Sequence, residues 1–378
     1  MNKIRKKAIF SFFSGAGFLD LGFEVSDYDV VYVNEIYEPF INSYKHARIK
    51  MALNTPLFGH FKEDITTLTD KKNRKRISSL VEIARQKNQL VGFIGGPPCP
   101  DFSVGGKNRG SIGENGKLSA TYVDVIIQQK PDFFLFENVK GLWRTKKHRE
   151  YFELLKNKLH HSGFVTTERL INSIEYGAPQ DRERIILLGF SNNLMKNLGY
   201  QSINETIPDG IFPWRKNVKW TREAFKDYPW PSTNKFSENS KLLKPQQVPE
   251  ELTVEYWFWK NRVYDHINAS NHFKPREALR KFLTLEEGDV SKKSFKRLHR
   301  WRYSPTAAYG NNEVHIHPYK ARRISVSEAL AIQSLPKNFE LPRTMTLSDM
   351  FKAIGNGVPF LAARGIAQTI NNFIGKTA

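Results

Sequence analysis

The sequence predicts an α/β protein with a doubly wound, mostly parallel sheet and a second, smaller domain of irregular or β-rich structure. Short apolar runs alternate with longer amphipathic stretches through the first half of the chain, as in strands joined by helices. After Phe190 this alternation stops and Pro, Asn, Trp and Lys become frequent, and a helical pattern returns only from Ser348. We therefore expect a catalytic and cofactor-binding domain of residues 1–190 plus 345–378, and a second domain of residues 191–344.

Five apolar runs are the predicted strands of the sheet. They begin at Ala8, Asp29, Leu90, Pro131 and Arg184. In a doubly wound sheet, ligands bind beyond the carboxyl ends of the strands, so the residues that follow these runs are the first candidates for a site.

Composition limits the classes of protein that fit. The chain has 378 residues, a formal net charge of +20 and a hydrophobic fraction of 40%, which suits a folded protein with a polyanionic partner such as nucleic acid. Its one cysteine excludes an intramolecular disulfide and a thiolate metal cluster within one chain, and we expect no metal site. Because no run of eighteen apolar residues occurs, we expect no membrane partner and a cytoplasmic protein.

The first strand ends in a turn of small residues, and the second ends next to an acid. Gly15 and Gly17 follow Phe13 in the segment FFSGAG, where backbone amides approach a ligand at a helix N-terminus. Glu35 lies where a nucleoside-binding fold places an acid for the ribose hydroxyls. A tight strand–helix turn and a surface glutamate are the alternative interpretations, and the two features together favour a nucleoside cofactor without a phosphate chain.

The third strand leads into Cys99, which has prolines on both sides and a glycine-rich, basic loop after it. Most free cysteines are inert core residues, but this one lies at the ligand edge of the sheet near positive charge that favours a thiolate. We interpret Cys99 as a nucleophile. Lys107 and Arg109 in the following loop are available to phosphates.

Glu137 ends the fourth strand, and Arg182 and Arg184 precede the fifth. An acid at the sheet edge is suited to give or share a proton. On an extended chain the two arginines point to the same face, where they need an anionic or carbonyl-rich partner. A capping acid and salt-bridged surface arginines remain the alternatives.

In this order the motifs FFSGAG, Asn34–Glu35, Asp64–Ile65, GPPC, ENV, QDRER, RISVSEALAIQSLP and GNGVP resemble the cytosine-5 DNA methyltransferase family, in its bacterial restriction-modification type. The resemblance runs from about Phe12 to Pro359. It implies a Rossmann-like methyltransferase domain that binds S-adenosylmethionine. The residues implied at the cofactor are Phe13, Gly15, Gly17, Glu35, Asp64, Ile65, Pro98, Leu118, Asn356 and Val358.

The resemblance also implies the reaction. Cys99 would attack carbon 6 of cytosine, Glu137 would bond ring nitrogen 3, and Arg182 and Arg184 would orient these groups and hold the carbonyl oxygen of the base. Addition of a thiolate makes carbon 5 nucleophilic enough to accept a methyl group, and the base must leave the duplex first.

The implied substrate is double-stranded DNA in the bacterial nucleoid, bound by a monomer. A cognate restriction endonuclease acting on the same site is a possible partner. Residues 191–344 would be the target-recognition domain. The expected DNA contacts are Ser103, Lys107, Arg109, Lys293 and Arg297.

Other activities compete with this interpretation. The tRNA-methylating branch of the family has a much smaller recognition region than this chain. Amino-methyltransferases need a Pro-Pro-aromatic motif, whereas Pro97–Pro98 here runs into Cys99. The other superfamily of RNA cytosine-5 enzymes uses two cysteines. A non-catalytic DNA-binding protein on this scaffold is disfavoured because Cys99, Glu137 and both arginines are present.

Overall fold

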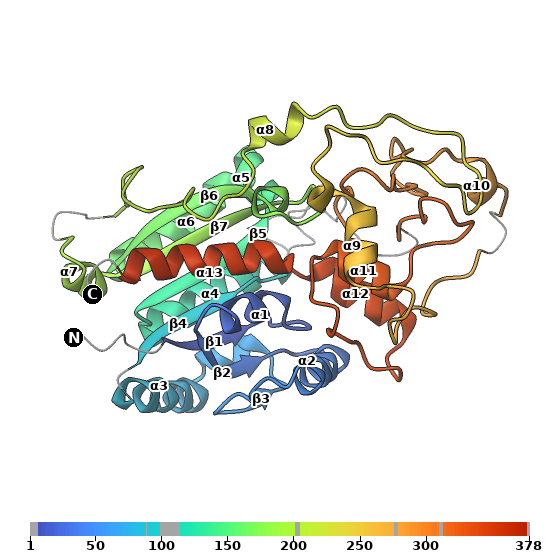
Figure 1. The fold of residues 1–378 in the computed structure, drawn as a ribbon. Coiled ribbons are helices and arrows are strands. Elements are labelled where there is room, and N and C mark those ends of the chain that lie inside the picture. The colour runs from blue at the N-terminus through green and yellow to red at the C-terminus, as the bar shows by residue number, and fades with distance from the viewer. Residues whose placement is uncertain are drawn as a thin grey trace.

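The computed structural model describes residues 7–87, 89–98, 114–200, 205–275, 279–307, 309 and 313–375. Its centre is a seven-stranded sheet with the order β3-β2-β1-β4-β5-β7-β6 (Figure 1). The strands are β1 (Lys7–Phe12), β2 (Asp29–Asn34), β3 (His60–Phe61), β4 (Leu90–Gly95), β5 (Phe133–Val139), β6 (Phe164–Asn172) and β7 (Glu183–Ser191). The helices are α1 (Phe18–Glu24), α2 (Glu38–Lys50), α3 (Lys71–Gln86), α4 (Glu114–Gln129), α5 (Lys140–Arg144), α6 (Lys146–His161), α7 (Asn192–Asn197), α8 (Arg222–Lys226), α9 (Val254–Lys260), α10 (Leu279–Thr284), α11 (Val326–Ile332), α12 (Leu347–Asn356) and α13 (Phe360–Ile374).

The five predicted strands correspond to β1, β2, β4, β5 and β7. The neighbours from β3 to β5 are parallel, whereas β7 runs antiparallel to both β5 and β6. The prediction of a mostly parallel sheet is therefore confirmed, and β3 and β6 are additional to it.

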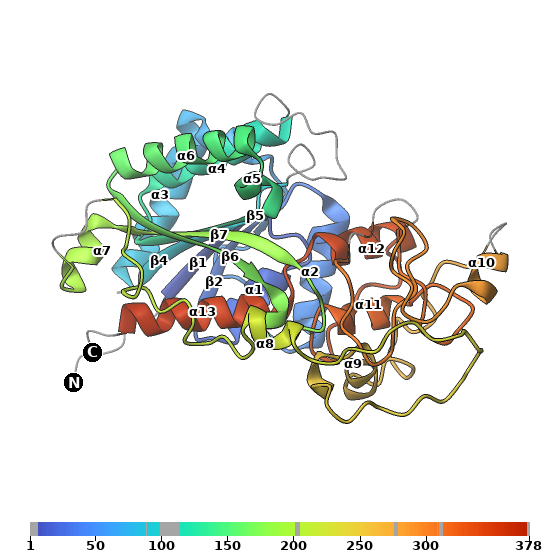
Figure 2. The ribbon, with the colours of Figure 1, turned by 90° about the horizontal axis from the view of Figure 1, so that it is seen from above.

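Helices cover both faces of the sheet (Figure 2). On one face α3, α4 and α6 pack on a core that includes Phe10, Phe93 and Phe134. On the other, α1 and α13 pack on a core that includes Ile9 and Phe133. Consecutive strand residues therefore contribute to opposite cores, so buried strands read as continuous apolar runs.

Helix α13 packs on the second face of the sheet and contacts residues from the first thirty positions of the chain. The Lys7 ammonium donates to Asn371 Oδ1 at 2.7 Å, and the Tyr28 hydroxyl donates to the Ala367 carbonyl at 3.1 Å. A Cβ on Gly22 of α1 would lie 2.5 Å from the Ala363 Cβ, so the absence of a side chain allows α1 and α13 this close approach. The connection between α12 and α13 is thereby held at the ligand edge of the sheet.

A second lobe contains α9, α10, α11 and α12 joined by long irregular segments (Figure 1). Between residues 205 and 344, the described part of the chain has no strand in the sheet and only isolated bridges, such as Asn234 with Glu287, so it is irregular rather than β-rich. Its core also includes Phe18 of α1 and Phe40 of α2, so the lobe packs directly on the sheet domain. Ile207 lies in the sheet-domain core although it follows residue 190.

Within the described residues, the helices are all too short or too polar to cross a membrane.

Candidate active site

Arg182 and Arg184 lie at the same edge of the sheet as Glu137 because of the direction of β7. In a wholly parallel sheet, Arg182 and Arg184 would begin a strand and would lie at the opposite edge from Glu137. Because β7 is antiparallel to β5, Arg184 pairs with Val139 and Ile186 pairs with Glu137. The start of β7 therefore lies beside the end of β5, and the two arginines join the edge where ligands bind.

Glu137 and Arg184 form an ion pair at this edge. Arg184 Nε lies 3.0 Å from Glu137 Oε1, and both side chains are largely buried. Breaking a buried pair is costly because it leaves an uncompensated charge, so each side chain holds the other in place. The Glu137 carboxylate therefore has a fixed position from which to bond a ligand.

Arg182 is fully buried beside this pair. Its Nη1 donates to the Ala307 carbonyl at 3.1 Å and its Nη2 donates to the Gly355 carbonyl at 2.9 Å, whereas its buried Nε has no partner among the described residues. Burial, and then the charge of Arg184, lower the pKa of the Arg182 guanidinium below its usual value. Arg182 thus connects the sheet edge to the second lobe and to the α12–α13 connection.

The turn that leads to Cys99 packs on the Glu137 side chain. A Cβ on Gly96 would lie 2.7 Å from Glu137 Oε2, and Asn138 Nδ2 donates to the Pro97 carbonyl at 3.4 Å. Pro98 is exposed, and Cys99 lies outside the described residues. The contacts at Gly96 and Pro97 show that the described part of this turn packs on Glu137 and Asn138.

Glu35 is anchored at the end of β2. Its Oε2 accepts from the Gly15 N–H at 3.0 Å and its Oε1 accepts from the Tyr37 N–H at 2.8 Å. Burial raises the pKa of the Glu35 carboxyl, and these backbone hydrogen bonds partly offset the rise. Each oxygen keeps a lone pair in a fixed direction, as binding of ribose hydroxyls requires.

The turn after β1 has an unusual backbone conformation. Phe13 has φ 52°, Gly15 has φ 56° and Gly17 has φ 80°, all in the left-handed region. No heavy atom lies within 4 Å of a Cβ built on Gly15, so the turn faces open space there. At Gly17 a Cβ would collide with Tyr44 and Arg48, which explains the glycine at this position. A non-glycine residue at positive φ, such as Phe13, is a strained feature that is common at ligand sites.

The remaining cofactor candidates lie on either side of this turn. Asp64 Oδ1 accepts from the Thr66 N–H at 2.9 Å and caps the short 3-10 helix Ile65–Thr69, whose first residue is buried. Leu118 of α4 is half-buried in the same core as Ile65. Asn356 is exposed at the end of α12, and Val358 is buried just after it.

Of the residues predicted to contact DNA, only two are described. Ser103, Lys107 and Arg109 lie outside the described residues. Lys293 has a side chain that is 73% exposed, 3.6 Å from Glu313, and it remains available to a phosphate. Arg297 is fully buried, and its guanidinium donates to the carbonyl oxygens of Leu285, His317 and Phe282. Direct contact between Arg297 and DNA is not compatible with this burial, so its role is structural.

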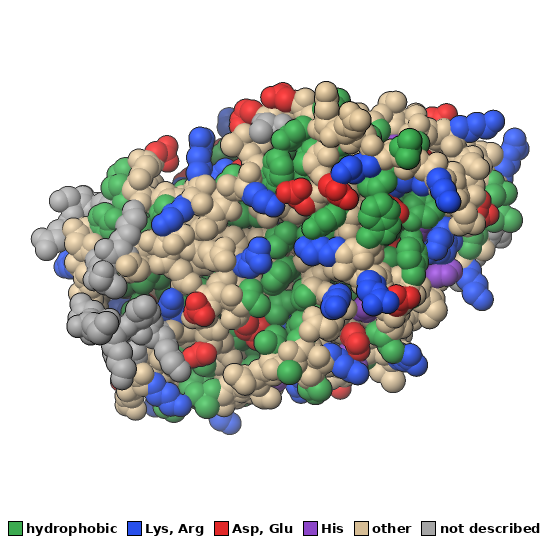
Figure 3. Space-filling view, in the orientation of Figure 1, with side chains coloured by type: hydrophobic (Ala, Val, Ile, Leu, Met, Phe, Trp, Pro, Cys, Tyr) green, Lys and Arg blue, Asp and Glu red, His purple; other side chains and the backbone are tan. Residues whose placement is uncertain are grey.

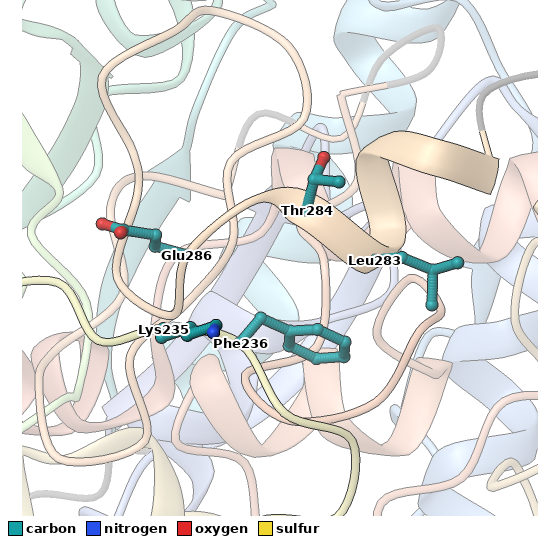
Figure 4. A pocket seen from close by; sticks show the side chains of 5 residues that line it. All are labelled: Lys235, Phe236, Leu283, Thr284 and Glu286. Carbon is teal, nitrogen blue, oxygen red and sulfur yellow. The ribbon is translucent and has the colours of Figure 1, made fainter.

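A space-filling view and a close-up add to this description. On the face shown in Figure 3, Lys and Arg side chains are scattered over both lobes among Asp and Glu. A hollow in the second lobe is lined by Lys235, Phe236, Leu283, Thr284 and Glu286 (Figure 4). It lies by α10, away from the strand ends, and contains none of the predicted site residues.

Two site features were not singled out from the sequence. Ile36, next to Glu35, has an exposed fraction of 56%, which is high for an apolar side chain beside the proposed ribose acid. Gly96 matters because it has no side chain, which leaves room for the Glu137 carboxylate. The Gly-Pro turn before Cys99 is the sequence feature that could have indicated it.

Comparisons with known proteins agree with this geometry. A model of the C-5 cytosine-specific DNA methylase family matches residues 8–372. The chain is 56% identical to the Type II methyltransferase M.NmeDI of Neisseria meningitidis serogroup C over 98% of this chain and 84% of the relative. It is 29% identical to M.MthTI of Methanothermobacter thermautotrophicus over 96% of each chain. In fold it is similar to a DNA modification methyltransferase encoded within an E. coli prophage, with a TM-score of 0.64, 22% identity and coverage of 98% and 100% of the two chains.

Proposed function

Because this chain belongs to the C-5 cytosine-specific DNA methylase family, we propose that Cys99 is its nucleophile and that Glu137, Arg182 and Arg184 activate the base. The protein is a DNA cytosine-5 methyltransferase of the restriction-modification kind. The observation that carries the residue assignment is the Glu137–Arg184 pair against the turn of Gly96 and Pro97.

The methyl donor that we propose is S-adenosylmethionine. Its adenosine part fits the Glu35 carboxylate, which is anchored at the open turn of Gly15 by one oxygen and at Tyr37 by the other, together with Phe13, Ile65 and Pro98. The buried Ser14 hydroxyl has no partner among the described residues and is a further hydrogen-bonding group at this turn. Gly17, Asp64, Leu118, Asn356 and Val358 would complete the site. When bound, the cofactor supplies an electrophilic methyl group.

The chain's own residues then prepare the cytosine. The Cys99 thiolate adds to carbon 6 while Glu137, as the carboxylic acid, donates a hydrogen bond or its proton to ring nitrogen 3, so that carbon 5 becomes nucleophilic. Arg184 keeps the Glu137 side chain in place and is the arginine that would hold the carbonyl oxygen of the base. The sequence-based expectation that Arg182 also holds this oxygen does not fit its complete burial, so Arg182 would orient these groups through its bonds to Ala307 and Gly355. After methylation, solvent accepts the proton of carbon 5, the bond between carbon 6 and Cys99 Sγ breaks, and the ring double bond returns as the thiolate leaves.

We assign target recognition to the second lobe and double-stranded DNA to the face that joins the two lobes. The cytosine must be flipped out of the duplex to reach Cys99, at a cost of a few kcal/mol that contacts with DNA offset. We further propose that the protein acts as a monomer in the cytoplasm, at the nucleoid, with a restriction endonuclease of the same specificity as its partner.

Bisulfite sequencing of plasmid DNA from cells that express the protein tests this function. We expect protected cytosines at one recurring sequence in the wild type and none with Cys99→Ser. Wild-type DNA without protected cytosines would refute the activity, and full protection by Cys99→Ser would refute the nucleophile.

A further inference from the structure

Two buried glutamines, one in the motif QDRER and one in RISVSEALAIQSLP, form a hydrogen bond with each other. Neither has been given a role so far. Gln180 precedes Arg182, and Gln333 follows α11; both side chains are fully buried. Gln180 Nε2 donates to Gln333 Oε1 at 3.3 Å. Gln180 Oε1 accepts from the Ala307 N–H at 3.0 Å, and Gln333 Nε2 donates to the Ile354 carbonyl at 2.5 Å.

Together with Arg182, the two amides close a ring of hydrogen bonds. Arg182 binds the carbonyl of the same Ala307 and the carbonyl of Gly355, which follows Ile354. Ala307 is thus held at its N–H by Gln180 and at its carbonyl by Arg182. The ring connects three parts of the molecule, which are the start of β7, the second lobe and the end of α12.

The ring permits only one orientation of each amide. The Ala307 N–H requires the oxygen of Gln180, and the Ile354 carbonyl requires the nitrogen of Gln333, so the remaining amide atoms meet as donor and acceptor. A buried polar group that loses its partner is destabilising, so the loss of one amide would also leave its partners in the ring unsatisfied.

The second lobe is fixed to this ring through the backbone around Ala307. The Ser304 N–H donates to the Pro179 carbonyl and the Asp181 N–H donates to the Ser304 carbonyl, both at 2.8 Å. The Thr306 hydroxyl donates to the Asp181 carbonyl at 2.6 Å. A displacement of this segment is therefore passed to residues 179–182, and through the ring to Gly355, next to Asn356.

We propose that Gln180 and Gln333 are positioning residues, which hold Arg182 and the Gly355–Asn356 turn in register with the second lobe. This inference rests on the proposed function, because Arg182 and Asn356 would serve the base and the cofactor. DNA held by the second lobe is thereby aligned with the cofactor at the sheet edge.

The test replaces each glutamine by methionine, which has the same length without the amide. Gln129→Met is the matched control, because Gln129 is also a buried glutamine with two hydrogen bonds, from the Ser78 hydroxyl at 2.8 Å and to the Arg74 carbonyl at 3.1 Å. Gln129 joins α3 to α4 on the far side of the sheet from α13. The measurements are thermal unfolding, single-turnover methylation of a plasmid that carries the protected sites, and the affinities for S-adenosylmethionine and for DNA measured separately.

We expect Gln180→Met and Gln333→Met each to slow single-turnover methylation by about 10-fold or more, since misplacement of a reacting group by about 1 Å costs about 100-fold. Both affinities should stay within about 3-fold of wild type, and the double variant should be no slower than the slower single variant, because both act through one ring. Gln129→Met should lose stability and keep its rate.

Equal rates for Gln180→Met, Gln333→Met and Gln129→Met would overturn the proposal, as would effects that multiply in the double variant. If one variant does not fold, the other tests the same ring. Failure of the wild type to methylate would refute the proposed function instead.

Discussion

Replacement of Gly96 by alanine tests the placement of Glu137 directly. The new Cβ would lie 2.7 Å from Glu137 Oε2, whereas ordinary contact begins at 3.4 Å, so the carboxylate must retreat by about 0.7 Å. This movement also disturbs the 3.0 Å contact with Arg184. Because misplacement by about 1 Å costs about 100-fold, we expect the single-turnover rate constant of methyl transfer to fall by about 10- to 100-fold. The displaced atom is the end of a side chain, so the fold should be retained.

The assay is single-turnover transfer of labelled methyl groups, with circular dichroism and cofactor affinity as checks on the fold. The decisive comparison uses Glu137→Gln as a background. If Gly96→Ala acts through the Glu137 carboxylate, adding it to Glu137→Gln should change the rate by less than about 2-fold. A Gly96→Ala enzyme with nearly full activity, or one whose effect is undiminished in the Glu137→Gln background, would contradict the proposed role of Glu137.

Three further predictions follow from burial and charge. Because burial raises the pKa of Glu35 above its ordinary value of 4.5, cofactor affinity should weaken as the pH falls toward 4.5, and calorimetry should show no such weakening with Glu35→Gln. Burial raises the pKa of Asp20 from 3.8 to about 6, so between these pH values the folded state binds more protons than the unfolded state. The free energy of unfolding should therefore fall by ~3 kcal/mol as the pH rises from 3.8 to about 6. Urea unfolding of Asp20→Asn should lack this fall. Arg297→Met should lose about 3 kcal/mol of unfolding free energy, measured in urea. Lys293→Ala should keep its stability and should reduce by about 1 the slope of the logarithm of DNA affinity against the logarithm of salt concentration. A stable Arg297→Met protein with weakened DNA binding would contradict the structural role of Arg297.

The sequence was most informative where burial is complete. The strands that are buried on both faces appear as apolar runs, and their ends indicated Glu35, Glu137 and the turn before Cys99. Strand β6 was missed because polar residues interrupt its apolar ones from Thr166 to Arg169, as suits the edge of a sheet. The antiparallel direction of β7 could not be predicted without β6, which precedes it and pairs with it.

The second lobe was harder to predict because its stabilising interactions are polar and distant in sequence. Arg297 belongs to a basic run that is typical of a DNA-binding surface, yet it binds carbonyl oxygens in the interior. Composition cannot separate these two cases, because both use the same side chain. Similarly, no local pattern brings Gln180 to Gln333, which lies 153 residues away.

The docking of α13 on the sheet also has a consequence for the timing of synthesis. The apolar face around Ile9 is covered only in part, by α1, until residues 360–374 have been made, and Lys7 donates to Asn371 of that last helix. At about 5–20 residues per second, a ribosome needs roughly 20–75 s to reach that point. The nascent chain therefore passes most of its synthesis with an open sheet and an incomplete catalytic edge.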